Sequence, residues 1–198
     1  MFSYNEKRFE TVFKLATVLT RIIKILSMVV LGFIGLIALV VPFVPKRLLT
    51  FDLSGVEMLP IELMNVQINI PNTVFGDEIM IKWSVFSVLI AAGFLVAFAV
   101  VILHLLGKIL DDVGIKQPFS EANVQRLFQM AVVFMAAGVV LPGIMFVAAW
   151  QVVRALAIDA TFNYSLQVEW IFMGLLIYLL ASIFQYGKQL QDEVDQTV

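Results

Sequence analysis

The sequence predicts an all-α membrane protein with four transmembrane helices, an N-terminal interfacial amphipathic helix and an extracytoplasmic loop between the first two spans. Of its 198 residues, 61% are hydrophobic and 14% are charged, against roughly 45–50% and about 25% in soluble globular proteins. Four apolar segments also approach the roughly 20 residues that a helix needs to cross a hydrocarbon layer about 30 Å thick. We therefore expect one integral membrane domain over residues 1–198.

The four expected spans cover residues 25–44, 85–106, 127–150 and 168–186. The fourth span is the least apolar, because Glu169 and Gln185 stand near its two ends. Pro142 and Gly143 interrupt the third span, and they indicate a kink that neighbouring helices stabilise or, alternatively, a gating hinge.

The segment before the first span, from about Tyr4 to Lys24, has the pattern of an amphipathic helix. Apolar side chains recur at helical spacing, while Lys7, Arg8, Lys14 and Arg21 lie elsewhere around the axis. We expect this helix to lie on the inner leaflet and to bend into the first span. A docking surface for a partner helix is the alternative.

The outer loop, residues 45–80, contains the run VQINI at 66–70, whose alternation of apolar and polar residues predicts a short strand. Its acidic residues are scattered, whereas calcium sites need closely spaced oxygen ligands around a tight turn. We expect no metal site here and read the loop as a solvated cap.

The positions of lysine and arginine predict the orientation, because short cytoplasmic segments carry the excess of these residues. With the N-terminus inside, the inner side holds Lys7, Arg8, Lys14, Arg21, Lys24, Lys108, Lys116, Arg126 and Lys188. The outer side holds Lys46, Arg47, Lys82 and Arg154. Both termini, the connector at 108–123 and the tail at 187–198 are therefore expected in the cytoplasm.

Composition also limits the chemistry. The net charge is -2, whereas nucleic-acid-binding proteins are typically strongly basic. The absence of cysteine removes disulfides, thiolate zinc sites and cysteine nucleophiles, and His104 is the only histidine. We expect no catalytic site, no cofactor and no direct contact with nucleic acid.

The connector between the second and third spans contains residues that typically end one helix and begin the next. Gly114 can end one helix, Pro118 prevents its continuation, and Ser120 is a favourable N-cap for the next. Glu121 suits the positive end of that helix dipole. A plain connector is one interpretation, and a connector that also belongs to a recognition face is the other.

The stretch GIKQPFSEANVQRL resembles the signature G-x-PF-x-x-x-N-x-x-RL of a bacterial membrane family catalogued as Domain of Unknown Function 2975. The closing stretch YGKQLQDEVDQTV is similar to that family's C-terminal segment, and the resemblance covers nearly the whole chain. The chain departs from the family pattern at Phe128 and Gln129, where a second basic residue and an Ile-Gly pair are more usual. The matching residues are Gly114, Pro118, Phe119, Asn123, Arg126, Leu127, Gly187, Leu190, Gln191, Glu193, Asp195 and Thr197.

The resemblance implies a four-span protein of the bacterial inner membrane. It implies no catalytic residues, because none are assigned in the family. Members are often encoded beside a small helix-turn-helix regulator, which implies such a protein partner by association. Membrane lipids, a larger membrane assembly and a second copy of the chain are the other expected partners.

Polar residues within the spans gather near the expected inner face. They form a polar belt of Ser27, His104, Gln129, Ser182 and Gln185. Hydrogen bonds between such residues would join the helices. His104 is most simply a packing residue, with a pH sensor and a haem or metal ligand as alternatives. Helical spacing extends the belt into two stripes, one of His104, Lys108 and Asp111, and one of Gln185, Gln189 and Asp192.

Arg126 is expected to pair with Asp111 or with the acids of the tail, which would hold the connector against the last helix. The predicted cytoplasmic interaction face comprises Asp111, Pro118, Phe119, Asn123, Arg126, Gln189, Gln191, Glu193 and Asp195. The sequence thus favours a non-enzymatic interaction, regulatory or accessory subunit. A small transporter or channel component is the second hypothesis, and a membrane enzyme is the third.

Overall fold

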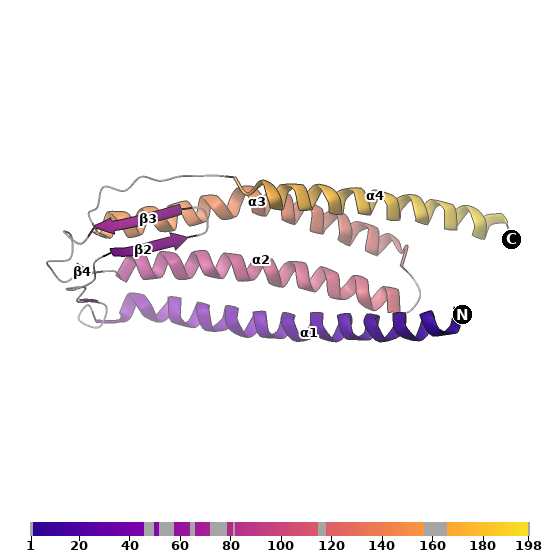
Figure 1. Cartoon of the computed structure of the whole chain (residues 1–198), viewed down its shortest axis with the longest axis horizontal. Helices are drawn as coiled ribbons and strands as arrows, with labels where there is room; N and C mark the ends of the chain where they lie inside the picture. The colour runs from indigo at the N-terminus through magenta and orange to yellow at the C-terminus, as the bar shows by residue number, and fades with distance from the viewer. Residues whose placement is uncertain are drawn as a thin grey trace. The chain divides into compact units, whose positions relative to one another are not determined.

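The computed structural model describes residues 2–45, 50–51, 58–63, 66–71, 79–80, 82–114, 118–156 and 166–197. Four long helices dominate this part of the chain, and short strands occupy the loop between the first two helices (Figure 1). The helices are α1 (Phe2–Val40), α2 (Lys82–Gly114), α3 (Glu121–Leu156) and α4 (Val168–Thr197). All four are long and apolar enough to cross a membrane, as expected from the sequence.

Helix α1 runs without interruption from Phe2 to Val40 and passes into the 3-10 turn η1 (Val41–Phe43). The amphipathic segment and the first span are therefore one helix, not two. The local reason is that residues 2–40 contain no proline, and Pro42 then stands in the first turn of η1, where its missing N–H costs nothing.

Among the described residues of the loop between α1 and α2, two antiparallel strand pairs form. Strand β2 (Met58–Leu63) pairs with β3 (Val66–Pro71), and β1 (Thr50–Phe51) pairs with β4 (Ile79–Met80). The predicted strand at 66–70 is confirmed, in register with Leu59 opposite Ile70. Its partner β2 was not predicted, because Pro60 breaks the alternation that marks a strand.

The helices extend beyond the predicted apolar segments at their charged ends. Helix α2 continues past residue 106 through Lys108, Asp111 and Asp112 to Gly114, where the sequence predicted that it would end. Glycine is common after the last helical turn because it adopts conformations that other residues avoid. The polar end of α2 therefore carries Lys108, Asp111 and Asp112 beyond the apolar segment.

Contacts divide the chain into two compact units. Unit 1 contains residues 1–29, 97–137 and 168–198 and therefore both chain termini. Its core joins Ile109, Leu127, Met130 and Ala181. In the same unit, the rings of Phe98, Phe134 and Trp170 lie within 5.0–5.9 Å of one another, centroid to centroid. The three helices α2, α3 and α4 thus share one apolar core in unit 1.

Unit 2 contains residues 30–96 and 138–167. Ala91 of α2 packs there with Met145 and Ala148 of α3. The Nζ atom of Lys82 donates to the carbonyl groups of Pro42 and Val44, the latter at 3.3 Å. Lys82 therefore links the start of α2 to the end of η1. It also satisfies carbonyl groups that have no hydrogen-bond partner within the helix end.

Pro142 leaves a carbonyl without its usual partner, and the structure supplies another. Because proline has no N–H, it cannot donate to the carbonyl of Gly138 four residues earlier. The backbone N–H of Gln167 donates to that carbonyl at 3.3 Å. The proline is thus accommodated inside α3, and the residue just before α4 is anchored to it.

Helix α4 is antiparallel to α3 and pairs with its first half. Gln167 contacts Gly138, Gly174 lies against Ala131, and Lys188 meets Glu121. Consequently α4 begins level with the middle of the apolar segment of α3, and its last turns continue beyond the start of α3.

Candidate functional site

The connector between α2 and α3 folds as a capped helix start. The backbone N–H of Asn123 donates to the Oγ atom of Ser120 at 3.3 Å, and the N–H of Val124 donates to the Ser120 carbonyl at 3.1 Å. Ser120 is therefore the N-cap of α3, as predicted from the sequence. The cap satisfies amide groups that the first helical turn leaves without partners.

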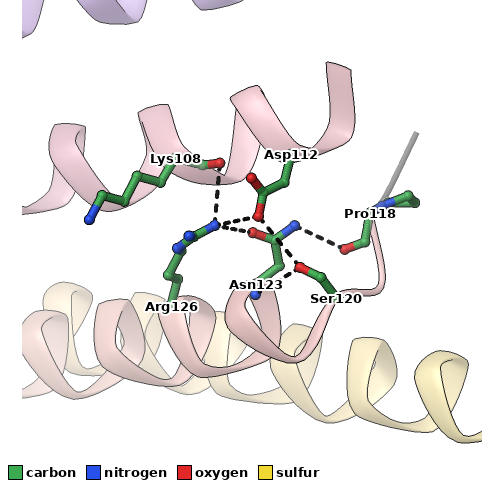
Figure 2. A network of polar contacts seen from close by, with 6 residues as sticks. All are labelled: Lys108, Asp112, Pro118, Ser120, Asn123 and Arg126. Atoms are coloured by element: carbon green, nitrogen blue, oxygen red, sulfur yellow. Dashed lines mark hydrogen bonds and ion pairs between the residues drawn. The ribbon is translucent and has the colours of Figure 1, made fainter. Parts of the chain in front are cut away.

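Arg126 is the centre of a polar network that joins α2, the connector and α3 (Figure 2). Its guanidinium donates to Asp112 Oδ2 at 2.6 Å, to Asn123 Oδ1 at 2.7 Å and to the Lys108 carbonyl at 3.4 Å. The side chain of Asn123 is fully buried and donates in turn to the Pro118 carbonyl at 3.3 Å. One arginine thus fixes the end of α2 to the start of α3.

The predicted pairing of Arg126 with Asp111 is wrong, because its carboxylate partner is Asp112. Asp111 instead pairs with Arg21 of α1 at 2.6 Å. Adjacent residues on a helix point about 100° apart, so Asp111 faces α1 while Asp112 faces α3. The Arg126–Asp112 pair is also the more protected one, with side chains 21% and 27% exposed against 61% and 52%.

The tail helix α4 meets the connector at Phe119 and Glu121, and not through the alternative pairing of Arg126 with the acids of the tail, which is also wrong. The ring of Phe119 lies 5.2 Å from that of Phe184, centroid to centroid. It also covers Gly187, where a Cβ atom would come within 3.0 Å of the ring. Lys188 Nζ pairs with Glu121 Oε2 at 3.2 Å. The two segments that carry the family resemblance therefore lie against each other.

A polar groove of about 290 Å³ runs between α3 and α4 in unit 1. We call it the amide groove because three glutamines line it. Its lining residues are Glu121, Val124, Gln125, Phe128, Gln185, Lys188, Gln189 and Asp192. Gln185, Gln189 and Asp192 share the groove as their helical spacing predicts. Amide side chains offer both donors and acceptors, so the groove can hydrogen-bond polar groups of either kind.

Of the described residues of the predicted interaction face, only Gln189 lines this groove. Pro118, Asn123 and Arg126 belong to the network with α2, and Asp111 lies against Arg21 of α1. Gln191 and Glu193 are exposed on the last turns of α4 and do not line the groove. The side chain of Asp195 lies outside the described residues. Tyr186 and Leu190 add exposed apolar side chains to the same part of α4.

The five residues of the polar belt all belong to unit 1. His104, Gln129 and Gln185 are exposed, and Ser182 donates to the Tyr178 carbonyl of its own helix at 3.1 Å. In the part of the chain that the structure describes, no hydrogen bond joins two of the five. The helices of unit 1 are joined instead by the Arg126 network, the Lys188–Glu121 pair and apolar packing.

Sequence reasoning missed three features of the site. Asp112 was passed over in favour of its neighbour Asp111, although helical phase distinguishes the two. The pairing of Glu121 with Lys188 was also missed, although their opposite charges indicated that they could pair. The close approach of α4 to α3 at Gly174 had no signal, because a single glycine in an apolar run has many interpretations.

Among the residues that the structure describes, no cluster of histidine and acidic side chains has the arrangement of a metal site. A model of the family described as "Protein of unknown function (DUF2975)" matches residues 30–198 of the chain. No curated protein matches the chain, and no solved structure matches it.

Proposed function

Because the chain belongs to the DUF2975 family of unknown function, we propose its role from the contacts between its connector and its tail helix. In this proposal it is a non-enzymatic membrane protein that acts as a regulatory or accessory subunit. Its partner is a protein that binds where the connector meets the tail. The membrane is the bacterial inner membrane, with both termini in the cytoplasm.

The observation that carries the proposal is the meeting of two distant segments. Phe119 and Glu121 of the connector contact Phe184, Gly187 and Lys188 near the tail. Residues more than 60 positions apart thereby build one polar groove, and Tyr186 and Leu190 are exposed apolar side chains on the same part of α4. Exposed apolar groups beside hydrogen-bonding groups are typical of sites that bind another protein.

The chemistry of the groove supports binding more than catalysis. Its ionisable groups are Glu121, Lys188 and Asp192, and the first two pair with each other. Covalent catalysis needs a side-chain nucleophile that an adjacent group activates, and these groups do not form such a pair. The proposed partner is therefore recognised, not modified, and the gene pairing implied by the family resemblance makes a small helix-turn-helix regulator the first candidate.

Photo-crosslinking tests this function at a single residue. A photoreactive amino acid replacing Gln189 in the amide groove is expected to give one protein adduct of defined mass in living cells. The matched control replaces Phe172, which is exposed on the apolar part of the same helix, and is expected to give lipid adducts only. Identical products at both positions would contradict the proposal. Adducts with the chain itself would show that the partner is a second copy of the chain and not a regulator.

A small transporter remains the second candidate, and one observation favours it. Helix α4 begins level with Gly138, within the apolar segment of α3, and Glu169 is exposed in its first turn. Ionisable groups at membrane depth often mark ion or substrate pathways. Solute flux by the purified protein in liposomes, abolished by Glu169→Gln, would favour this function over the regulatory one.

A further inference from the structure

A second groove, of about 760 Å³, opens between α1 and α2 in unit 1. Phe13 and Leu110 contribute apolar surface to it. A Cβ atom at Gly114 would lie 3.4 Å from the Phe13 ring, so glycine lets that ring lie close to α2. The groove is thus an open trough with an apolar lining, on the same unit as the amide groove but between different helices.

The charged residues of this trough are balanced. Lys14 and Arg21 are basic, while Glu10 and Asp111 are acidic. Arg21 and Asp111 pair at 2.6 Å, and both are more than half exposed. The Thr17 hydroxyl donates to the Phe13 carbonyl at 3.0 Å, so recognition of a polar ligand falls mainly to the four charged side chains.

This balance selects among the molecules that can reach such a trough. A purely anionic ligand would meet two carboxylates as well as two cations, and a purely cationic ligand would meet the reverse. A ligand that carries one phosphate and one primary ammonium group satisfies both kinds of residue. The ammonium offers three hydrogen-bond donors to the carboxylates, and the phosphate accepts from Lys14 and Arg21.

We propose that this trough binds a phospholipid with a zwitterionic, primary-amine headgroup, that is, phosphatidylethanolamine. The apolar surface supports a lipid over a soluble zwitterion, because Val18 of the trough is followed along α1 by exposed Ile22 and Leu26. Acyl chains lie along these side chains while the headgroup contacts Glu10 and Lys14.

The proposal predicts a specific order of preference among lipids. Phosphatidylcholine has the same charges, but its trimethylammonium group cannot donate hydrogen bonds to Glu10 or Asp111. Phosphatidylglycerol lacks the ammonium and leaves both carboxylates without a ligand group. Phosphatidylethanolamine is therefore expected to be retained in preference to both lipids.

Lipid retention by the full-length protein tests this preference. The protein is exchanged into mixed micelles with equal amounts of the three lipids, and the bound lipids are counted by native mass spectrometry. Lys14→Gln is expected to lower phosphatidylethanolamine retention by roughly two- to five-fold, as for the loss of one partly exposed ion pair. Glu10→Gln is expected to shift the preference towards phosphatidylglycerol, because the trough then carries a net positive charge.

Arg154→Gln provides the matched control, because Arg154 is exposed and lies in unit 2. It removes one positive charge and is expected to leave the retained lipids unchanged. Equal retention of the three lipids by the native chain would overturn the proposal, and so would an unchanged preference in both Lys14→Gln and Glu10→Gln. A thermal melt of each variant shows that it remains folded.

Discussion

Gly174→Ala is expected to destabilise the protein by about 1–3 kcal/mol, the usual range for forcing extra atoms into a packed interior. A Cβ atom at this position would lie 2.6 Å from Met135 Cγ, 2.8 Å from the Ala131 carbonyl oxygen and 3.0 Å from the Met135 nitrogen. Two of these three neighbours are backbone atoms, which cannot rotate away. The helices α3 and α4 would have to separate, and a lower thermal midpoint in detergent measures the effect.

Gly107→Ala is the control for this experiment. Gly107 lies in α2, and a Cβ atom there would have nothing within 4 Å. Since alanine favours the helix over glycine, this variant is expected to be as stable as the native chain or slightly more stable. Equal melting of the two variants would show that α4 does not approach α3 at Gly174 as described.

Arg126→Ala is expected to cost about 2–3 kcal/mol, because charged hydrogen bonds are lost and the partially buried groups they satisfied are left behind. The guanidinium donates hydrogen bonds to Asp112, to Asn123 and to the Lys108 carbonyl. A double-mutant cycle with Asp112→Ala isolates the ion pair. We expect a coupling energy of about 1 kcal/mol, since this pair is better protected than an ordinary surface pair.

The neighbouring acid supplies the control. A cycle of Arg126→Ala with Asp111→Ala is expected to be additive within about 0.5 kcal/mol, because Asp111 pairs with Arg21. Coupling at position 111 together with additivity at position 112 would reverse the assignment of the two acids. Unfolding monitored by circular dichroism in one detergent gives all six stabilities on the same scale.

The helical spans were predictable from the sequence because they depend on length and apolarity alone. The strand at 66–70 was predictable because its alternation is regular, whereas Pro60 concealed its partner β2. The length of α1 was not predicted. Its change from amphipathic to uniformly apolar suggests a boundary, but residues 2–40 contain no proline to create one.

The candidate site was predictable as a region but not as a set of contacts. Ser120 as a cap follows from local chemistry, and the spacing of Gln185, Gln189 and Asp192 places them on one face. The partners of Arg126 depend on how far α2 is rotated about its axis relative to α3. Rotating α2 by the angle between two adjacent residues would turn Asp111 towards α3 in place of Asp112. Composition and hydropathy do not indicate this rotation.

In the proposed function, the connector and the tail form one face on the cytoplasmic side of the membrane. Because the chain has no cysteine, Gln125→Cys and Gln189→Cys each introduce a single thiol into the amide groove. With a membrane-impermeant thiol reagent, we expect that neither thiol is labelled in cells whose inner membrane is intact and that both are labelled after permeabilisation. Labelling of either thiol from outside intact cells would contradict this placement of the connector and the tail.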